Sequence, residues 1–418
     1  MSVSVPRFSV SAPAPPPAGR VVLPWSKSVL IRQLAMDFLL GRTPALPGGP
    51  QADDVVAMAR VVSVLRRGQG GDLDAGEATT VARFAMALAA ATPGRWRVTG
   101  RGRLPNRPMK PLADALRQWG AELEWEGEEG RLPVRIVGRE VLHFAPVRMR
   151  ADVSSQFISA LALPALKAED RLHIALEGRP VSMPYLRMTL TMLERAGVRS
   201  QWRENVLTLW REEAAAVPQW MPERDWSAAL FWVMMAVTAP EARLTFPDLS
   251  LSSLQGDAQV AVKLADVGLL RMTQAPDGLY VEGGPQQVEK IDWAMQDMPD
   301  AVLPLAAGLA LRGVPFSFSG VAHLRHKESD RLAMLAALLR DLNMAVEVGP
   351  DTLSARPLGP LPSSLRLQTA HDHRMAMLAG LLTLKIPQVH IDDLDCVRKS
   401  FPTFWPQLRK MGWTILHA

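Results

Sequence analysis

The order of polar and apolar residues repeats along the chain. Six helix-like runs of small apolar residues each follow a polar start. These starts are Ser26, Thr80, Ser154, Ser227, Asp300 and Asp372-His373. From Thr80 to His373 the successive starts lie 74, 73, 73 and 73 residues apart. Such regular spacing predicts a repeated structural unit.

A second series consists of amphipathic helices, each followed by Gly or Asn and then by a strand. Gly or Asn in this position is typical of a left-handed helix cap. Five of these ends are Leu116 to Gly120, Leu193 to Gly197, Leu264 to Gly268, Leu339 to Asn343 and Leu408 to Gly412, and Val55 to Gly68 is a sixth. The first interval is shorter in both series: 54 residues between the helix starts Ser26 and Thr80, and 52 residues between the helix ends Gly68 and Gly120. The pattern predicts an α/β fold of six units in two halves, each unit with a buried helix, an amphipathic helix and short strands. Taken singly, each polar start also suits an ordinary N-cap.

Composition and charge narrow the class of protein. The chain has 418 residues and 48% apolar content, enough for two domains of roughly 200 residues each. Its net charge of +5 comes from scattered cations rather than basic tracts, which favours small acidic ligands over nucleic acid. The single cysteine excludes a disulfide framework and indicates a reducing cytoplasm. Neither a membrane-spanning helix nor a secretory signal is predicted.

Two charged clusters carry the candidate chemistry. Lys327-Glu328-Ser329-Asp330-Arg331 and Asp372-His373-Arg374 each open an apolar, helix-like run. Cations aimed from helix starts at one point favour an anionic, phosphorylated substrate. Glu328 and Arg331 lie three residues apart on one helix face. That spacing suits either a surface salt bridge or a proton carrier whose protonation depends on the bound anion.

Weaker signals lie in the first half of the chain. Lys27, Ser28 and Arg32 lie near one helix start and suit phosphate or carboxylate oxygens, although Ser-Lys-Ser is more often a solvated helix start. Two prolines bracket Arg107, which favours either a rigid carboxylate clamp or an exposed loop arginine. Arg83 follows Thr79-Thr80 and is expected to pair with a nearby acid.

A third helix start, Asp152 to Phe157, presents the hydrogen-bonding side chains of Ser154, Ser155 and Gln156. They suit sugar-like hydroxyls, but helix capping alone explains one of the three equally well. Ser182 and Tyr185 are expected to add further polar contacts.

In this order, eight segments of the chain resemble the EPSP synthase (enolpyruvylshikimate-phosphate synthase) family. They are Leu23 to Arg32, Asp74 to Arg83, Arg103 to Pro108, Val153 to Phe157, Val181 to Tyr185, Lys327 to Leu332, Asp372 to Met377 and Arg398 to Pro402. The resemblance runs from about Val22 to Trp413. It implies a two-domain inside-out α/β barrel of six βαβαββ-type repeats, three per domain, closing over shikimate 3-phosphate and phosphoenolpyruvate. The expected domains are 23–223 and 224–418, with segment 1–22 joined to the second.

Site residues are also implied by this resemblance. The ligands of the shikimate phosphate would be Lys27, Ser28, Arg32, Ser154, Ser155, Gln156, Ser182, Asp300 and Lys327. The phosphoenolpyruvate clamp would be Lys27, Arg107, Gln156, Arg331, Arg374 and Lys399, and Thr79 and His323 join the substrate-binding set. Asp300 would accept the hydroxyl proton, Glu328 would shuttle a proton at C3, and Lys27 would protonate or hold the bridging oxygen. The resemblance implies a cytoplasmic monomer of the shikimate pathway, with no metal, cofactor, nucleic-acid or membrane partner.

Four positions depart from the family pattern. Thr79 replaces a Gly, and its β-branched side chain is expected to weaken phosphoenolpyruvate binding and inhibition by glyphosate, the family's competitor at that site. Trp25 replaces a small residue, Arg224 a Gly, and His323 an Asn. A related transferase acting on UDP-N-acetylglucosamine is disfavoured, because its loop cysteine is missing from Arg103 to Met109. A silent paralogue that binds phosphorylated metabolites without turnover, or a transferase with another acceptor, remains the alternative.

Overall fold

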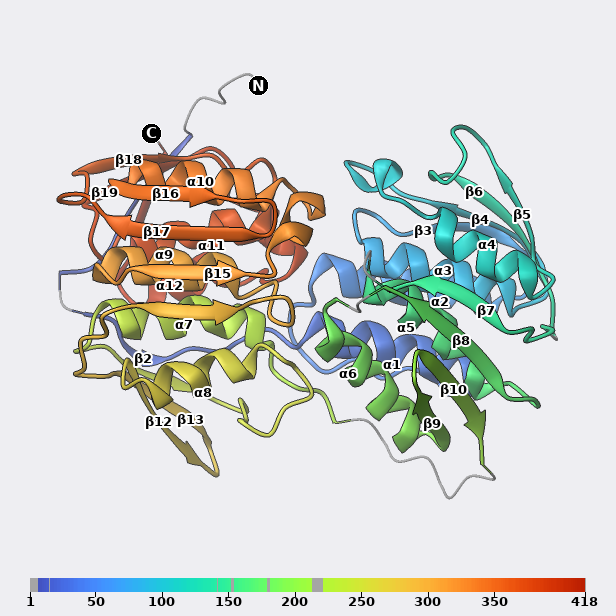
Figure 1. Ribbon diagram of the computed structural model, residues 1–418. Coiled ribbons are helices and arrows are strands. Elements are labelled where there is room, and N and C mark those ends of the chain that lie inside the picture. The colour runs from blue at the N-terminus through green and yellow to red at the C-terminus, as the bar shows by residue number, and fades with distance from the viewer. Residues whose placement is uncertain are drawn as a thin grey trace. The chain divides into compact units, whose positions relative to one another are not determined.

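The computed structural model describes residues 7–14, 16–140, 142–151, 154–178, 181–212 and 221–417. The chain forms two compact units (Figure 1). The terminal unit comprises Met1–Trp25 and Glu223–Ala418, and the inserted unit comprises Ser26–Pro222. The chain therefore leaves the terminal unit after Trp25 and returns to it at Glu223. Asp152 and Val153, which belong to one of the predicted motifs, lie outside the described residues.

Three modules of one topology build the terminal unit. The elements of the middle module are β14 (Ile291–Ala294), α9 (Val302–Arg312), β15 (Phe316–Ser319), the 3-10 helix η3 (Ala322–His326), α10 (Arg331–Asp341), β16 (Met344–Val348) and β17 (Thr352–Pro357). Strands β14 and β15 are parallel, with α9 as their crossover, and β17 pairs antiparallel with both β15 and β16. The sheet order is β14-β15-β17-β16.

N-terminal strands complete the other two modules of this unit. One contains β2 (Ala18–Arg20), α7 (Trp226–Thr238), β11 (Arg243–Phe246), α8 (Ala258–Asp266), β12 (Leu270–Ala275) and β13 (Gly278–Gly283). The other contains β18 (Ser364–Leu367), α11 (His373–Leu382), β19 (Gln388–Ile391), the 3-10 helix η4 (Asp395–Lys399), α12 (Phe404–Lys410), β20 (Thr414–His417) and β1 (Phe8–Ser11). Strand β2 lies parallel to β11, and β1 lies between β19 and β20. The N-terminal segment thus supplies one strand to each of these two sheets, β2 to one and β1 to the other.

Two sheet-bearing modules and one helix pair form the inserted unit. The sheet-bearing modules contain β3 (Gly71–Asp74), α3 (Thr79–Ala90), β4 (Gly94–Thr99), η1 (Leu104–Asn106), α4 (Lys110–Gln118), β5 (Glu122–Trp125) and β6 (Val134–Gly138), then β7 (Val147–Arg150), α5 (Ser155–Ala162), η2 (Leu163–Leu166), β8 (Leu172–Glu177), α6 (Met183–Arg195), β9 (Val198–Arg203) and β10 (Val206–Arg211). The pair α1 (Lys27–Leu39) and α2 (Asp53–Arg66) has no four-stranded sheet of its own among the described residues. This missing sheet accounts for the shorter first interval in the sequence.

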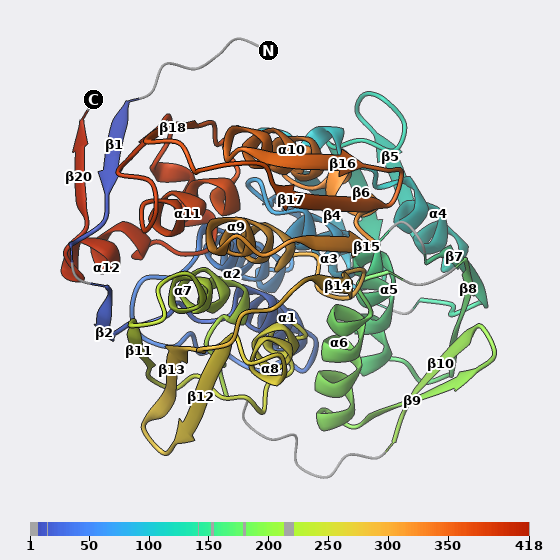
Figure 2. The same cartoon turned by 60° about the vertical axis from the view of Figure 1, so that its left-hand side comes forward.

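Buried helices form the core of each unit. In the terminal unit α7, α9 and α11 pack against one another, as Figure 2 shows, and every residue of α7 is buried. Helix α7 carries no charged residue, so it has no face that prefers water. In the inserted unit α3 packs against α1 and α5 in the same way. Helices inside and sheets outside give the layering that the sequence predicts.

The predicted helix starts agree with the structure to within two residues. Helix α5 begins after Ser154, whose side chain accepts a hydrogen bond from the Gln156 amide, and α11 begins after Asp372. All six predicted terminators adopt the left-handed conformation; for example, Gly120 has φ 89° and Asn343 has φ 60°. No helix among the described residues combines the length and the apolar character needed to cross a membrane.

Candidate active site

Arg331 begins α10 and is the centre of a buried charge cluster in the terminal unit. Its guanidinium donates to Asp300 Oδ1 at 2.9 Å and to Asp372 Oδ2 and Oδ1 at 2.8 and 3.1 Å. It also pairs with Glu328 Oε2 at 2.8 Å. Burial opposes the charged form, but the carboxylates of Asp372, Glu328 and Asp300 outweigh it and raise the pKa of Arg331. The arginine is therefore a permanent cation that holds three carboxylates in place.

Asp372 is the fully buried N-cap of α11. Besides binding Arg331, its carboxylate accepts hydrogen bonds from the Arg374 amide at 3.0 Å and from Ser329 Oγ at 2.9 Å. Each carboxylate oxygen thus has a donor, which a buried charge needs. Asp372 joins the starts of α10 and α11, although 41 residues separate it from Arg331 in the sequence.

Three cations surround Asp300, which lies just before α9. Arg331 Nη1 lies 2.9 Å from Oδ1, Arg374 Nη2 lies 3.2 Å from Oδ2, and Lys327 Nζ lies 4.0 Å from Oδ1. Burial lowers the pKa of Lys327, and the charge of Asp300 opposes this shift. The structure thus brings together five predicted residues: Asp300, Lys327, Glu328, Arg331 and Arg374. In this arrangement carboxylates and cations can bind an anion and transfer a proton.

His323 and Lys399 lie at two 3-10 turns of the same unit. Burial, and then the charge of Lys327, lowers the pKa of His323 to about 4, so its ring is neutral at pH 7. Its buried Nε2 has no hydrogen-bond partner among the described residues. Lys399 ends η4, which packs against α11, and is half-buried.

Asp257 precedes α8 and was not predicted as a site residue. Ser227 Oγ donates a hydrogen bond to its Oδ2. Burial, followed by the negative charge of Asp300, raises the pKa of Asp257 to about 7. The sequence marked Ser227 as a helix start, but its partner 30 residues further on gave no signal of its own.

Arg83 organises a second cluster, in the inserted unit. Its Nη1 donates to Gln156 Oε1 at 2.8 Å and to Ser154 Oγ at 3.0 Å, and its Nη2 donates to the Pro108 carbonyl at 3.1 Å. The guanidinium lies 4.0 Å from the centre of the Phe157 ring. Burial, and then Arg107, lowers the pKa of Arg83 to about 9. Among the described residues the bonds of Arg83 all go to neutral oxygens, and none goes to the acid that the sequence predicts.

Helix α1 contributes two further cations. Lys27 Nζ pairs with Asp54 Oδ2 at 2.7 Å, which joins the starts of α1 and α2. Arg32 is 2% exposed and donates to Thr189 Oγ1 at 2.7 Å, the Ser28 carbonyl at 2.8 Å and the Tyr185 carbonyl at 3.1 Å. In this structure Arg32 therefore braces α1 against α6.

Of the remaining predicted residues of the inserted unit, three lie at helix starts and Arg107 lies just after η1. Thr79 is the half-buried first residue of α3, and Ser155 is the buried first residue of α5. Ser182 precedes α6 with φ 55°, an uncommon conformation for serine. Arg107 follows η1 and lies near enough to Arg83 to influence its charge.

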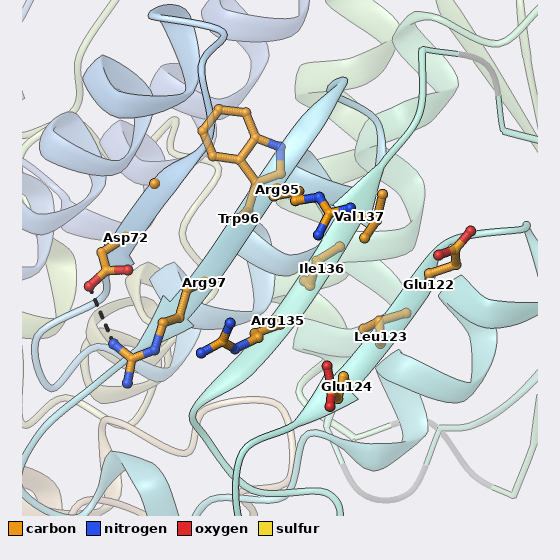
Figure 3. Close-up of a pocket in the computed structure, with 11 residues that line it drawn as sticks. Asp72, Arg95, Trp96, Arg97, Glu122, Leu123, Glu124, Arg135, Ile136 and Val137 are labelled. Atoms are coloured by element: carbon orange, nitrogen blue, oxygen red, sulfur yellow. Dashed lines mark hydrogen bonds and ion pairs between the residues drawn. The ribbon is translucent and has the colours of Figure 1, made fainter.

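A hollow of about 490 Å³ lies elsewhere, on the outer face of the sheet β3-β4-β6-β5 (Figure 3). No predicted site residue lines it. Its charged side chains pair with one another: Arg97 lies 3.3 Å from Asp72 and 2.8 Å from Glu126, which also binds Arg135. We interpret the hollow as a solvated sheet surface with cross-strand ion pairs rather than as a substrate site.

Comparison with known proteins gives one consistent result. Residues 19–408 match the family model described as EPSP synthase (3-phosphoshikimate 1-carboxyvinyltransferase). The 3-phosphoshikimate 1-carboxyvinyltransferase of Bacteroides fragilis strain YCH46 is 31% identical over 412 residues, which cover 98% of each chain. That of Burkholderia lata is 32% identical over 423 residues, covering 94% of this chain and 97% of the relative.

Solved structures confirm the fold class. An EPSP synthase from Acinetobacter baumannii superimposes with a TM-score of 0.77 at 20% identity, covering 99% of this chain and all of the other. The enolpyruvyl transferase NikO from Streptomyces tendae gives a TM-score of 0.71 at 13% identity, covering 100% and 99% of the two chains. At these identities the likeness concerns the fold alone.

Proposed function

Because this chain belongs to the EPSP synthase family and is an enolpyruvyl transferase, we propose that it transfers the enolpyruvyl group of phosphoenolpyruvate to the 5-hydroxyl of shikimate 3-phosphate. Phosphate leaves, and the product continues along the shikimate pathway towards chorismate and the aromatic amino acids. The observation that carries the proposal is the cluster in which Lys327, Arg331 and Arg374 surround Asp300.

The chemistry requires one proton acceptor and one proton donor. The acceptor hydroxyl adds to C2 of phosphoenolpyruvate while C3 gains a proton, and the tetrahedral intermediate then loses phosphate and one C3 proton to form the enolpyruvyl double bond. Asp300 accepts the hydroxyl proton, Glu328 moves a proton at C3, and Lys27 protonates or holds the bridging oxygen. Their cationic neighbours stabilise the negative charge of two phosphorylated carboxylates, so the proposal needs no metal or organic cofactor.

The pair of Glu328 and Arg331 supports a proton-carrying role for Glu328. The pair is 2.8 Å long, and the arginine side chain is 1% exposed while the glutamate side chain is 23% exposed. A substrate carboxylate that binds Arg331 competes with Glu328 for the same guanidinium. Loss of that partner favours the protonated form of the glutamate. Substrate binding thus prepares the acid that the reaction needs.

The proposed ligands include residues of each cluster. Arg83 holds Ser154 and Gln156, whose remaining hydrogen-bonding capacity suits acceptor hydroxyls and phosphate oxygens. Ser155 and Ser182 start the neighbouring helices. The full proposed substrate-binding set is Lys27, Ser28, Arg32, Thr79, Arg107, Ser154, Ser155, Gln156, Ser182, Asp300, His323, Lys327, Arg331, Arg374 and Lys399.

The test is phosphate release by the purified protein with both substrates and with each omitted in turn. Glu328→Gln preserves the size of the side chain but removes its ability to exchange a proton. We expect turnover to fall about 10²- to 10⁴-fold, the range for loss of a general acid or base. Glu347→Gln is the matched control, because Glu347 is exposed on β16 of the same unit and should leave turnover unchanged.

Each outcome separates one part of the proposal. Release that needs both substrates and Glu328 supports the acceptor and the role of the glutamate. Release with phosphoenolpyruvate and a different hydroxyl acceptor would overturn the choice of acceptor while leaving enolpyruvyl transfer intact. Binding of both substrates by isothermal titration without release would favour a silent paralogue.

A further inference from the structure

Two positions where the sequence departs from the family pattern lie against each other. Trp25 and Arg224 form an isolated antiparallel β-bridge, and the Arg224 guanidinium lies 3.6 Å from the centre of the Trp25 ring. Arg224 Nη1 also donates to the Leu23 carbonyl at 2.9 Å. The arginine side chain is 13% exposed, so the contact is largely shielded from water. A cation over an indole face at this distance is attractive.

Each partner immediately precedes the start of a helix, α1 with Lys27 in its first turn and α7 with Ser227 in its first turn. Trp25 is followed by Ser26, the residue before α1, and then by Lys27. Arg224 is followed by Asp225, the N-cap of α7, and two residues later by Ser227, which binds Asp257. The contact therefore joins the two chain segments at which the chain leaves and re-enters the terminal unit.

Further hydrogen bonds link these residues to their neighbours in the terminal unit. The Asp225 amide donates to the Pro24 carbonyl at 3.0 Å. Gln255, which is 7% exposed, donates to the Arg224 carbonyl at 2.7 Å and accepts from the Trp226 amide at 3.0 Å. A displacement of Arg224 is thus transmitted directly to the first turn of α7, and a displacement of Trp25 to the first turn of α1.

We propose that Trp25 and Arg224 act as a positioning pair that fixes the starts of α1 and α7 for enolpyruvyl transfer. The proposal rests on the function proposed above. Neither residue touches the reacting atoms; they act through Lys27 on one side and through Asp225 and Ser227 on the other. A large aromatic ring and a guanidinium stand where the family pattern has a small residue and a glycine, and each provides a surface that the other contacts.

The first arm of the test needs no substrate. The Leu30 amide donates to the Ser26 carbonyl at 2.9 Å, and the Ala229 amide donates to the Asp225 carbonyl at 3.0 Å. Hydrogen exchange at these two amides reports the order of the first turns of α1 and α7. Trp25→Ala and Arg224→Gln should each accelerate exchange at both amides about three- to tenfold, and the double variant should show no further increase.

The second arm measures kcat and KM for both substrates. We expect kcat/KM to fall about three- to tenfold in Trp25→Ala and in Arg224→Gln, and Trp25→Phe to recover most of it because the ring is kept. Asp248→Asn is the matched control: it removes the 2.9 Å ion pair of Arg224 with an exposed aspartate but leaves the indole contact in place. It should leave exchange and kinetics unchanged.

The outcomes distinguish this proposal from the proposed function. A lower melting temperature with unchanged exchange at Leu30 and Ala229 and unchanged kinetics would overturn it, because the pair would then be merely structural. Equal effects of Trp25→Phe and Trp25→Ala would also overturn it. Faster exchange in a protein whose parent shows no transfer would support positioning of the helix starts and count against the proposed function instead.

Discussion

The two clusters treat a buried arginine in opposite ways. In the terminal unit Arg331 is held by Asp300, Glu328 and Asp372, and these carboxylates raise its pKa. In the inserted unit the bonds that Arg83 makes with described residues go to a hydroxyl, an amide oxygen and a carbonyl, and burial lowers its pKa to about 9. One arginine has its charge balanced by the protein, whereas the other relies on dipoles.

This difference assigns different tasks to the clusters. Arginine remains charged in proteins, so the lowered pKa of Arg83 expresses an unbalanced cation rather than a titration near pH 9. A buried cation without a carboxylate partner is stabilised when an anion binds beside it. The balanced cluster around Arg331 instead contains carboxylates that can exchange protons when an anion takes one of their partners. We infer that the inserted unit mainly binds and that the terminal unit mainly transfers protons.

The largest expected effect tests the balanced cluster. Asp372→Asn leaves Arg331 and Ser329 facing a neutral amide inside the protein, and loss of one partner of a buried ion pair costs roughly 3–5 kcal/mol. We expect the free energy of unfolding, measured with urea, to fall by about that amount. Asp292→Asn is the control, because Asp292 pairs with Lys290 on the surface and its side chain is 71% exposed.

A change of less than about 1 kcal/mol for Asp372→Asn would contradict the interpretation of a balanced cluster, since a surface pair contributes no more than that. The comparison would then lose its basis, because Arg331 would tolerate an unpaired charge as Arg83 does.

Substitution of Arg83 should weaken substrate binding more than it lowers stability, the reverse of what we expect for Asp372. Arg83→Met removes the unbalanced cation but keeps much of the chain that packs on Phe157. We expect the free energy of unfolding to fall by only about 1–3 kcal/mol, because buried acceptors lose their donor but a buried charge is removed as well. The KM for shikimate 3-phosphate should rise about 10- to 100-fold, because Ser154 and Gln156 lose the charge-assisted hydrogen bonds that hold them in place.

Arg117→Met provides the control for this prediction, because Arg117 lies on α4 of the same unit with a side chain that is 35% exposed. Strong destabilisation by Arg83→Met together with an unchanged KM would show that Arg83 is structural, and the division of tasks between the clusters would fail.

The repeated helix starts and ends were predictable from the sequence, but the contacts between residues far apart in the sequence were not. Helix starts such as Ser154 and ends such as Gly120 follow from local capping chemistry, which acts over a few residues. The spacing of Glu328 and Arg331 also predicted their pairing, but not that the arginine would be buried, so the interpretation as a surface salt bridge is wrong.

Partners distant in the sequence could not be deduced. Asp372 binds Arg331 across 41 residues, and Arg83 meets Gln156 across 73 residues. These contacts exist because packed helices bring their starts together, and no local pattern records which starts will meet. Trp25 and Arg224 stood out singly as departures from the family pattern, and nothing in the sequence indicated that they would lie in contact.

The smallest expected effect concerns one side chain of the inserted unit, Thr79, and its influence on phosphoenolpyruvate binding. Thr79 begins α3 four residues before Arg83, and its side chain is half-buried. If the inserted unit mainly binds, Thr79→Gly should open space for phosphoenolpyruvate and lower its KM about threefold to tenfold, the effect of one to two methyl-sized groups. Inhibition by glyphosate should strengthen in parallel, while kcat stays close to that of the parent.

Thr80→Gly is the matched control, because it carries the same cost of glycine in the first turn of the same helix. Both variants should lower the melting temperature to a similar degree, so a change in KM confined to Thr79→Gly belongs to the side chain rather than to a loosened helix. Equal KM and glyphosate inhibition in Thr79→Gly and the parent would show that the threonine does not crowd the phosphoenolpyruvate site. A change in kcat alone would instead place Thr79 with the proton-transferring residues and blur the division of tasks between the two units.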